Sequence, residues 1–159
     1  EFVNLNGTLD CRAEGGVGGG GGWKTDGTAA GTVMVKDIKP GSNGSNLFSF
    51  VEANGQIFFH ADVGVNGLEL WKTDGTAAGT VLVKDINPGF TGSIPDDFTA
   101  VGNTVYFVAG TAAAGNEIWK TDGTAAGTTM VKDINPGTFG SNPSYLLEMN
   151  GMLYFRAFN

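Results

Sequence analysis

Residues 71–80 read Trp-Lys-Thr-Asp-Gly-Thr-Ala-Ala-Gly-Thr, and the same ten residues stand at 23–32 and again at 119–128. The residues that open these copies, Trp23, Trp71 and Trp119, are 48 positions apart in both intervals. Each copy continues into Val-Lys-Asp-Ile and then reaches a Pro-Gly pair. A fixed period of this length is typical of a chain in which one supersecondary unit is copied, so the fold is read from the unit.

The second copy of the unit shows the expected strands most clearly. Four runs are rich in β-branched and aromatic residues and are bounded by Gly, Asn or Pro, which predicts strands. These runs are 48–53, 56–61, 68–73 and 80–86. Asn54-Gly55 predicts a tight hairpin between the first two, because both central residues of a type I′ turn need positive φ. No stretch of the chain has a helical period.

Four short antiparallel strands in 48 residues are the content of one β-propeller blade. Runs such as Ile57-Phe58-Phe59 are apolar on both faces, as expected for a sheet packed between two neighbours. We therefore predict an all-β repeat protein of four-stranded antiparallel blades, forming an incomplete propeller or part of a larger array. The predicted segments are a degenerate first blade at 1–47, a second at 48–96, a third at 97–144, and the first hairpin of a fourth at 145–159.

The same strand assignment predicts side-chain neighbours within a blade. If Thr73 pairs with Thr80, Trp71 faces Leu82, and Glu69 faces Lys84 as an ion pair. The indole of each repeated Trp is large enough to fill the space between adjacent blades. The structural residues of the repeat are therefore Trp23, Trp71 and Trp119, together with the recurring Asp37, Asp85 and Asp133.

Three full periods leave the last 15 residues, which repeat the opening strand pair of the unit. Closed propellers typically have four to eight blades, so this number of units cannot close alone. We expect that further blades lie outside this chain, or that chains join end to end. The final hairpin leaves an open strand edge, which is a natural point for pairing with another chain.

The first unit departs from the pattern. Residues 15–22 read Gly-Gly-Val-Gly-Gly-Gly-Gly-Gly, so that Gly21-Gly22-Trp23 replaces Glu-Leu-Trp. A glycine run cannot bury side chains and is unfavourable in a strand. Two interpretations remain open, a degenerate terminal repeat or an imperfectly assigned sequence at this point.

The composition disfavours several classes of binding partner. The formal net charge is -7 without any run of Lys or Arg, which disfavours nucleic acid because phosphates require a basic face. One cysteine excludes an internal disulfide framework and a cysteine-based zinc cluster. No segment approaches 18 continuous apolar residues, so we expect no membrane insertion.

Glu69-Leu70-Trp71-Lys72-Thr73-Asp74-Gly75-Thr76 and its copy at 117–124 resemble the bacterial ELWxxDGT repeats, also described as hyalin-like. The resemblance covers essentially the whole chain, with Gly21 and Gly22 as the departure. It implies a large secreted or cell-surface protein and a β-propeller-like or β-rich array. It implies no catalytic residues, because none are assigned to the repeat.

Each residue type that suggests chemistry also has a structural explanation. The recurring Asp26, Asp74 and Asp122 are candidate calcium ligands, but calcium needs six to eight oxygens and each turn offers one carboxylate. We favour the alternative that these residues cap tight turns, with no bound cofactor. A lone histidine, His60, has no partners for a catalytic triad, so no catalytic residue is predicted.

Two further features concern sugars. Asn6 and Asn43 begin glycosylation sequons. The repeated Trp residues are candidates for sugar sites between blades, although their apolar neighbours favour a buried position. The leading prediction is a non-enzymatic, extracellular or cell-surface structural or adhesive module that assembles with flanking blades or further copies of itself. The alternative is a carbohydrate-binding, lectin-like propeller that recognises surface glycans.

Overall fold

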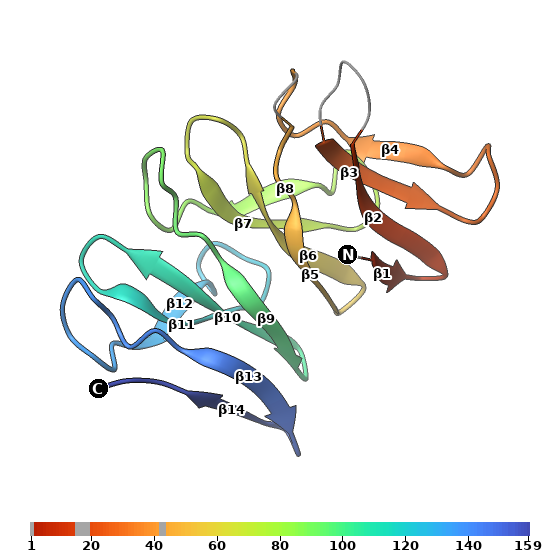
Figure 1. Ribbon diagram of the computed structural model, residues 1–159. Coiled ribbons are helices and arrows are strands. Elements are labelled where there is room, and N and C mark those ends of the chain that lie inside the picture. Colours follow the sequence, from red (N-terminus) through yellow and green to blue (C-terminus); the bar gives the residue numbers. More distant parts are fainter. Residues whose placement is uncertain (1, 15–19, 42–43) are drawn as a thin grey trace.

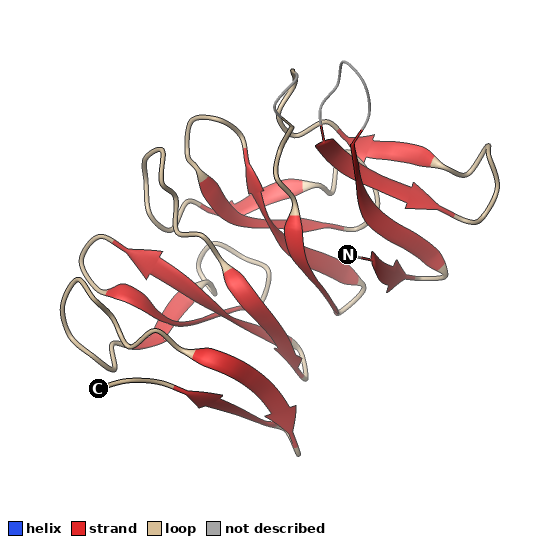
Figure 2. Ribbon diagram, viewed as in Figure 1, coloured by secondary structure: helices blue, strands red, loops and turns tan. Residues whose placement is uncertain are grey.

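The computed structural model describes residues 2–14, 20–41 and 44–159, and within them every regular element is a β-strand (Figure 2). The strands of the first sheet are β1 (Phe2–Leu5), β2 (Thr8–Glu14), β3 (Gly20–Thr25) and β4 (Val33–Lys36). Those of the second sheet are β5 (Phe48–Ala53), β6 (Gln56–Asp62), β7 (Leu68–Thr73) and β8 (Val81–Lys84). The third sheet contains β9 (Asp96–Val101), β10 (Thr104–Thr111), β11 (Gly115–Thr121) and β12 (Thr129–Lys132). A final hairpin contains β13 (Ser144–Met149) and β14 (Met152–Arg156).

Each sheet is a simple antiparallel meander in which strands follow one another in chain order. The predicted tight turns between the first two strands are confirmed. Asn54 and Gly55 have φ values of 55° and 70°, and Asn6 and Gly7 have 51° and 84°. Because asparagine and glycine tolerate positive φ, these dipeptides let each hairpin turn within two residues.

The sheets stand one after another rather than side by side in a single layer (Figure 1). Their first strands lie together, since β5 contacts both β1 and β9, and β9 also contacts β13. From these inner strands each sheet runs outward to its fourth strand. Within the described part of the chain the sheets do not close into a ring (Figure 1).

Two apolar clusters lie between successive sheets. Leu5 of the first sheet packs with Ile57, Phe59 and Trp71 of the second. Leu70 and Val83 of the second sheet pack in turn with Phe107 and Trp119 of the third. The second sheet therefore buries both of its faces, as its apolar strands predict. The first sheet covers one face and the third sheet covers the other.

The third and fourth strands of each sheet pair with a bulge. Trp71 lies opposite Leu82 as predicted, but the register then shifts, so that Leu70 rather than Glu69 lies opposite Lys84. The predicted Glu69–Lys84 ion pair is therefore wrong. The same shift recurs between Ile118 and Trp119 in the third sheet. A bulge of this kind moves the following side chains to the other face of the strand.

Candidate functional site

The Asp-Gly-Thr turn connects the third and fourth strands of each sheet. In the second sheet the Asp74 Oδ1 atom accepts hydrogen bonds from the Thr76 backbone N–H at 2.9 Å and from its hydroxyl at 2.7 Å. The Thr76 Oγ1 atom accepts the Gly79 N–H at 2.9 Å. A Cβ on Gly79 would lie 2.0 Å from the Asp74 carboxylate, so only glycine fits there. The turn is thus fixed by its own side chains.

The three turns have the same construction. Asp26 accepts two hydrogen bonds from Thr28, and Asp122 accepts two from Thr124. Hydrogen bonds from the Thr side chain and backbone lower the pKa of Asp26, Asp74 and Asp122 below the ordinary value of 3.8. Each carboxylate therefore has an occupied oxygen, and the predicted turn-capping geometry is present at all three positions.

No group of three or more His, Cys, Asp or Glu side chains gathers at a metal-binding distance among residues 2–14, 20–41 and 44–159. The calcium candidates Asp26, Asp74 and Asp122 are exposed and lie in separate turns. The second set of recurring acids is placed differently. The Asp85 Oδ2 atom accepts a hydrogen bond from the Asn66 side-chain amide at 2.5 Å, whereas Asp133 is exposed. Asp37, in the first sheet, is half-buried.

Trp71 and Trp119 pack against the sheet that precedes their own. Trp71 is 8% exposed and lies between the first and second sheets, while Trp119 is 7% exposed and lies between the second and third. Trp23 is half-buried. All three indole Nε1 atoms are buried and have no hydrogen-bond partner among the described residues. The indoles therefore contribute packing rather than polar contacts.

Buried glutamates form a second repeated contact that the sequence did not predict. Glu69 is fully buried, and its carboxylate accepts N–H groups of Ile86, Asn87 and Ser93 as well as the Ser93 hydroxyl, at 2.6–3.0 Å. Glu117 accepts the N–H of Asn135 and both the N–H and hydroxyl of Ser141. These carboxylates hold the linker that leads to the next sheet.

The electrostatics of Glu69 follow from this burial. Desolvation raises its pKa above the ordinary value of 4.5, and the hydrogen bonds from Ser93, Ile86 and Asn87 oppose that shift. In the first sheet Gly21 stands in place of the glutamate. There the Gly20 carbonyl oxygen accepts the Ser45 N–H and hydroxyl instead, both at 3.0 Å.

Lysine side chains join one sheet to the next. The Lys36 Nζ atom donates to the Thr80 carbonyl oxygen at 2.7 Å, and Lys84 donates to the Thr128 carbonyl at 2.7 Å. Lys24 also reaches the second sheet, through the Gly75 carbonyl at 2.8 Å. The acceptors are backbone atoms of the Asp-Gly-Thr turns. In the second and third sheets the turn is therefore both a hairpin connection and the docking point for the preceding sheet.

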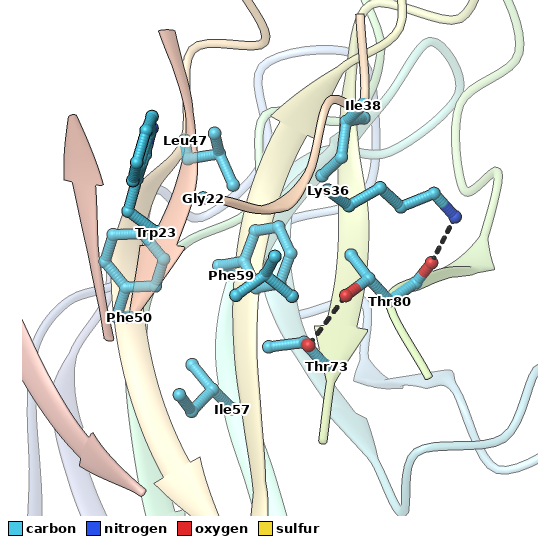
Figure 3. A pocket seen from close by; sticks show the side chains of 11 residues that line it. Gly22, Trp23, Lys36, Ile38, Leu47, Phe50, Ile57, Phe59, Thr73 and Thr80 are labelled. Atoms are coloured by element: carbon cyan, nitrogen blue, oxygen red, sulfur yellow. Dashed lines mark hydrogen bonds between the residues drawn. The ribbon is translucent and has the colours of Figure 1, made fainter. Parts of the chain in front are cut away.

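A small cavity lies beside Gly22, between the first and second sheets (Figure 3). It has a volume of about 20 Å³ and is lined mostly by apolar side chains, including Leu47, Phe59 and Ile57. Gly22 lies at its wall, where the second sheet has the fully buried Leu70. The missing leucine side chain accounts for the space.

The remaining candidates have simple placements. Asn6 lies in the exposed β1–β2 turn, and Asn43 lies outside the described residues. His60 is buried in β6, where its Nδ1 atom lies 2.6 Å from the Pro95 carbonyl oxygen of the linker to the third sheet. Asp96 and Asp97 begin strand β9.

Among the described residues, no helix is long and apolar enough to cross a lipid bilayer. Comparison of the chain with protein-family models, with curated proteins and with solved structures gives no match.

Proposed function

We propose that this chain is a non-enzymatic structural or adhesive repeat module, built from β-propeller-type blades, that acts outside the cell and associates with further copies of itself. The proposal rests on a contact between adjacent sheets that occurs twice with the same geometry. Lys36 and Lys84 make the same 2.7 Å hydrogen bond to the turn of the following sheet. Trp71 and Trp119 occupy the same place in the two apolar clusters.

A contact that repeats without change can add a further sheet in the same way. In open repeat arrays each unit touches only its neighbours, so the array is held by the contact between adjacent units. Lys132, the counterpart of Lys36 and Lys84, is exposed. The Thr32 position, whose counterparts accept these lysines, is also exposed in the first sheet. The two ends of the described array thus present complementary groups.

The β13–β14 hairpin offers an apolar surface for association. Its exposed side chains are Tyr145 at 76%, Leu147 at 59%, Met149 at 47%, Met152 at 56% and Tyr154 at 44%. Contiguous exposed apolar side chains mark interaction surfaces in soluble proteins. Strand β14 pairs only with β13, so its second edge is open for a further strand.

The extracellular setting rests on the sequence. The Glu-Leu-Trp and Asp-Gly-Thr residues resemble the ELWxxDGT repeats of bacterial surface proteins, and their roles in the fold are architectural. Glu69 holds a linker, Leu70 packs toward the next sheet, and Trp71 packs toward the previous one. Proteolysis of intact producing cells tests this setting, because a surface protein is cleaved without lysis.

The alternative of sugar binding by the repeated tryptophans has less structural support. Trp71 and Trp119 are 8% and 7% exposed and pack between sheets, so a sugar ring cannot stack on them without separating the sheets. A sugar site on Trp71 or Trp119 is therefore disfavoured.

A pair of substitutions tests association through the hairpin. We expect Leu147→Lys to weaken self-association, because it places a charge in the apolar hairpin surface, and Val65→Lys to leave it unchanged. Val65 is a suitable control because it is 66% exposed and lies in the β6–β7 loop. The mass of each variant is measured by light scattering at matched concentrations. Equal masses for both variants and the unmodified chain would contradict the proposed surface.

A further inference from the structure

Three adjoining hollows run across the third sheet and the linker before it. Their volumes are about 330, 230 and 210 Å³. Ile94 and Asn116 line both the first and the second hollow, and Asp96 and Asp97 line both the second and the third. Because neighbouring hollows share their walls, they form one elongated groove, which we call the linker groove.

The position of the linker groove follows from the fold. Its first part lies between the linker at 87–94 and the β10–β11 turn. Its second part passes the start of β9, and its third part reaches the start of β5. A surface depression of this size and length suits a small elongated molecule better than a single ion.

The linker groove is lined at positions where the third unit departs from the repeat. Asp96 and Asp97 stand where the second unit has Phe48 and Ser49 and where the last has Ser144 and Tyr145. Asn116 replaces Leu68 in the same way. Sheet packing does not require these changes, since the second unit packs with other residues there. Polar side chains at these positions therefore favour a role in ligand binding rather than in sheet packing.

Several of these polar groups are free to bind a ligand. Asp97 is exposed and makes no hydrogen bond to another described residue, and the same holds for the Thr91 hydroxyl. The Asn116 amide nitrogen donates to the Asn142 Oδ1 atom at 3.2 Å, which leaves the Asn116 carbonyl oxygen available. By contrast, the Ser93 hydroxyl is already bound to Glu69. The free groups that line the groove are chiefly oxygen acceptors.

Two exposed phenylalanines have backbones beside residues that line the groove. Phe90 is 83% exposed and directly precedes Thr91, a lining residue. Phe139 is 86% exposed, and its backbone carbonyl carbon would lie 2.5 Å from a Cβ on the lining residue Gly115. Covering such rings removes apolar surface from water, which favours a ligand with an apolar face. A sugar ring has such a face.

The charge of the linker groove limits which ligands can bind. No Lys, Arg or His side chain lines any of the three hollows. An anionic ligand would therefore meet Asp96 and Asp97 without a compensating cation. Hydroxyl groups, by contrast, donate favourably to a carboxylate. We propose that the linker groove binds a short uncharged oligosaccharide, with hydroxyls on Asp97 and Asn116 and ring faces on Phe90 and Phe139.

A glycan array followed by calorimetry tests this site. The probes are neutral hexaoses such as cellohexaose and maltohexaose, with heparin as the acidic glycan and oligolysine as a cationic peptide. We expect at least one neutral hexaose to bind. Asp97→Asn and Phe139→Ala should each weaken that binding by about tenfold or more, because each removes a direct contact. Asparagine suits position 97, where φ is 53°.

Val33→Ala is the apolar control, since Val33 is 40% exposed on β4 of the first sheet and lies outside both the groove lining and the β13–β14 hairpin. We expect its affinity to equal that of the unmodified chain. The inference is overturned if folded protein binds no neutral hexaose, if only heparin or oligolysine binds, or if the groove variants bind as well as the control. The light-scattering experiment on Leu147 is independent of these outcomes, so the two proposals can fail separately.

Discussion

At the residue scale, the Asp-Gly-Thr motif is a self-contained turn in which each side chain has a partner. Asp74 is bound by Thr76, Thr76 by Gly79, and the hydroxyls of Thr73 and Thr80 lie 2.7 Å apart across the hairpin. The ten-residue identity among the copies therefore reflects a local hydrogen-bond geometry. In the second and third sheets the turn also presents backbone carbonyls to the lysines of the preceding sheet.

The lowered pKa of the three turn aspartates predicts a specific response to acid. Their hydrogen bonds stabilise the fold while the carboxylates are ionised, fully above pH 3.8, and this contribution is lost as pH falls through the lowered pKa. We expect a chain with Asp26→Asn, Asp74→Asn and Asp122→Asn to lose less of its thermal midpoint between pH 5 and about pH 2 than the unmodified chain.

Thermal unfolding followed by circular dichroism measures this difference. Asp133→Asn serves as the control, because Asp133 is exposed and lies outside the turns. Identical acid profiles for the triple variant and the unmodified chain would show that the turn hydrogen bonds do not contribute to stability.

The buried glutamates give a second prediction at this scale. Glu69→Gln should destabilise the fold by about 2–3 kcal/mol, because the amide NH₂ faces backbone N–H donors and leaves them without an acceptor. Glu52→Gln should change stability far less, since Glu52 is exposed and accepts only the Gly55 N–H. Chemical denaturation of the two variants provides the comparison. Equal stabilities would mean that the linker is held by other contacts.

At the element scale, the two faces of a sheet make different contacts. In the first sheet, Gly22 changes the face that packs against the second sheet. Gly22 and Lys24 belong to the face that meets the second sheet, where Lys24 still reaches Gly75 but Gly22 provides no side chain. The interface between the first and second sheets therefore keeps its polar contacts and loses part of its apolar filling. The cavity beside Gly22 is the consequence.

Gly22 and Gly115 predict opposite effects of the same substitution. A Cβ on Gly22 would meet only Leu47, at 3.8 Å, so Gly22→Ala should stabilise the fold by about 0.5–1 kcal/mol by removing glycine from a strand. Gly115 has φ 61°, and its Cβ would lie 2.4 Å from the Gly140 nitrogen, so Gly115→Ala should destabilise it by about 1 kcal/mol or more. Denaturant midpoints distinguish the two. A loss of stability in Gly22→Ala would contradict this explanation of the cavity.

Much of the element order could be read from the sequence, because Asn-Gly turns, Pro-Gly stops and β-rich runs are local signals. The strands around Asn54-Gly55 and the pairing of Trp71 with Leu82 are examples. The predicted Glu69–Lys84 ion pair is wrong because a bulge between Leu70 and Trp71 shifts the register of the two strands. No residue pattern near these positions indicates a bulge. The role of Glu69 depends on Ser93, which lies 24 residues away. The groove residues Asp96 and Asn116 are distant in the sequence and line the same hollow only in the folded chain.

At the scale of the whole molecule, the described sheets form an open series in which each inner sheet is held on both faces. The second sheet receives Lys36 from the first and sends Lys84 to the third. The third sheet receives Lys84 and presents Lys132, which is exposed. The same pattern places exposed apolar side chains on the β13–β14 hairpin. An array of this kind gains stability with every unit added.

Sedimentation equilibrium of the unmodified chain over a wide concentration range tests the proposed self-association most directly. The account predicts species heavier than the 16.4 kDa monomer, with a mass that increases with concentration while the circular dichroism spectrum remains that of a folded β protein. A single folded species of 16.4 kDa at every concentration would contradict it.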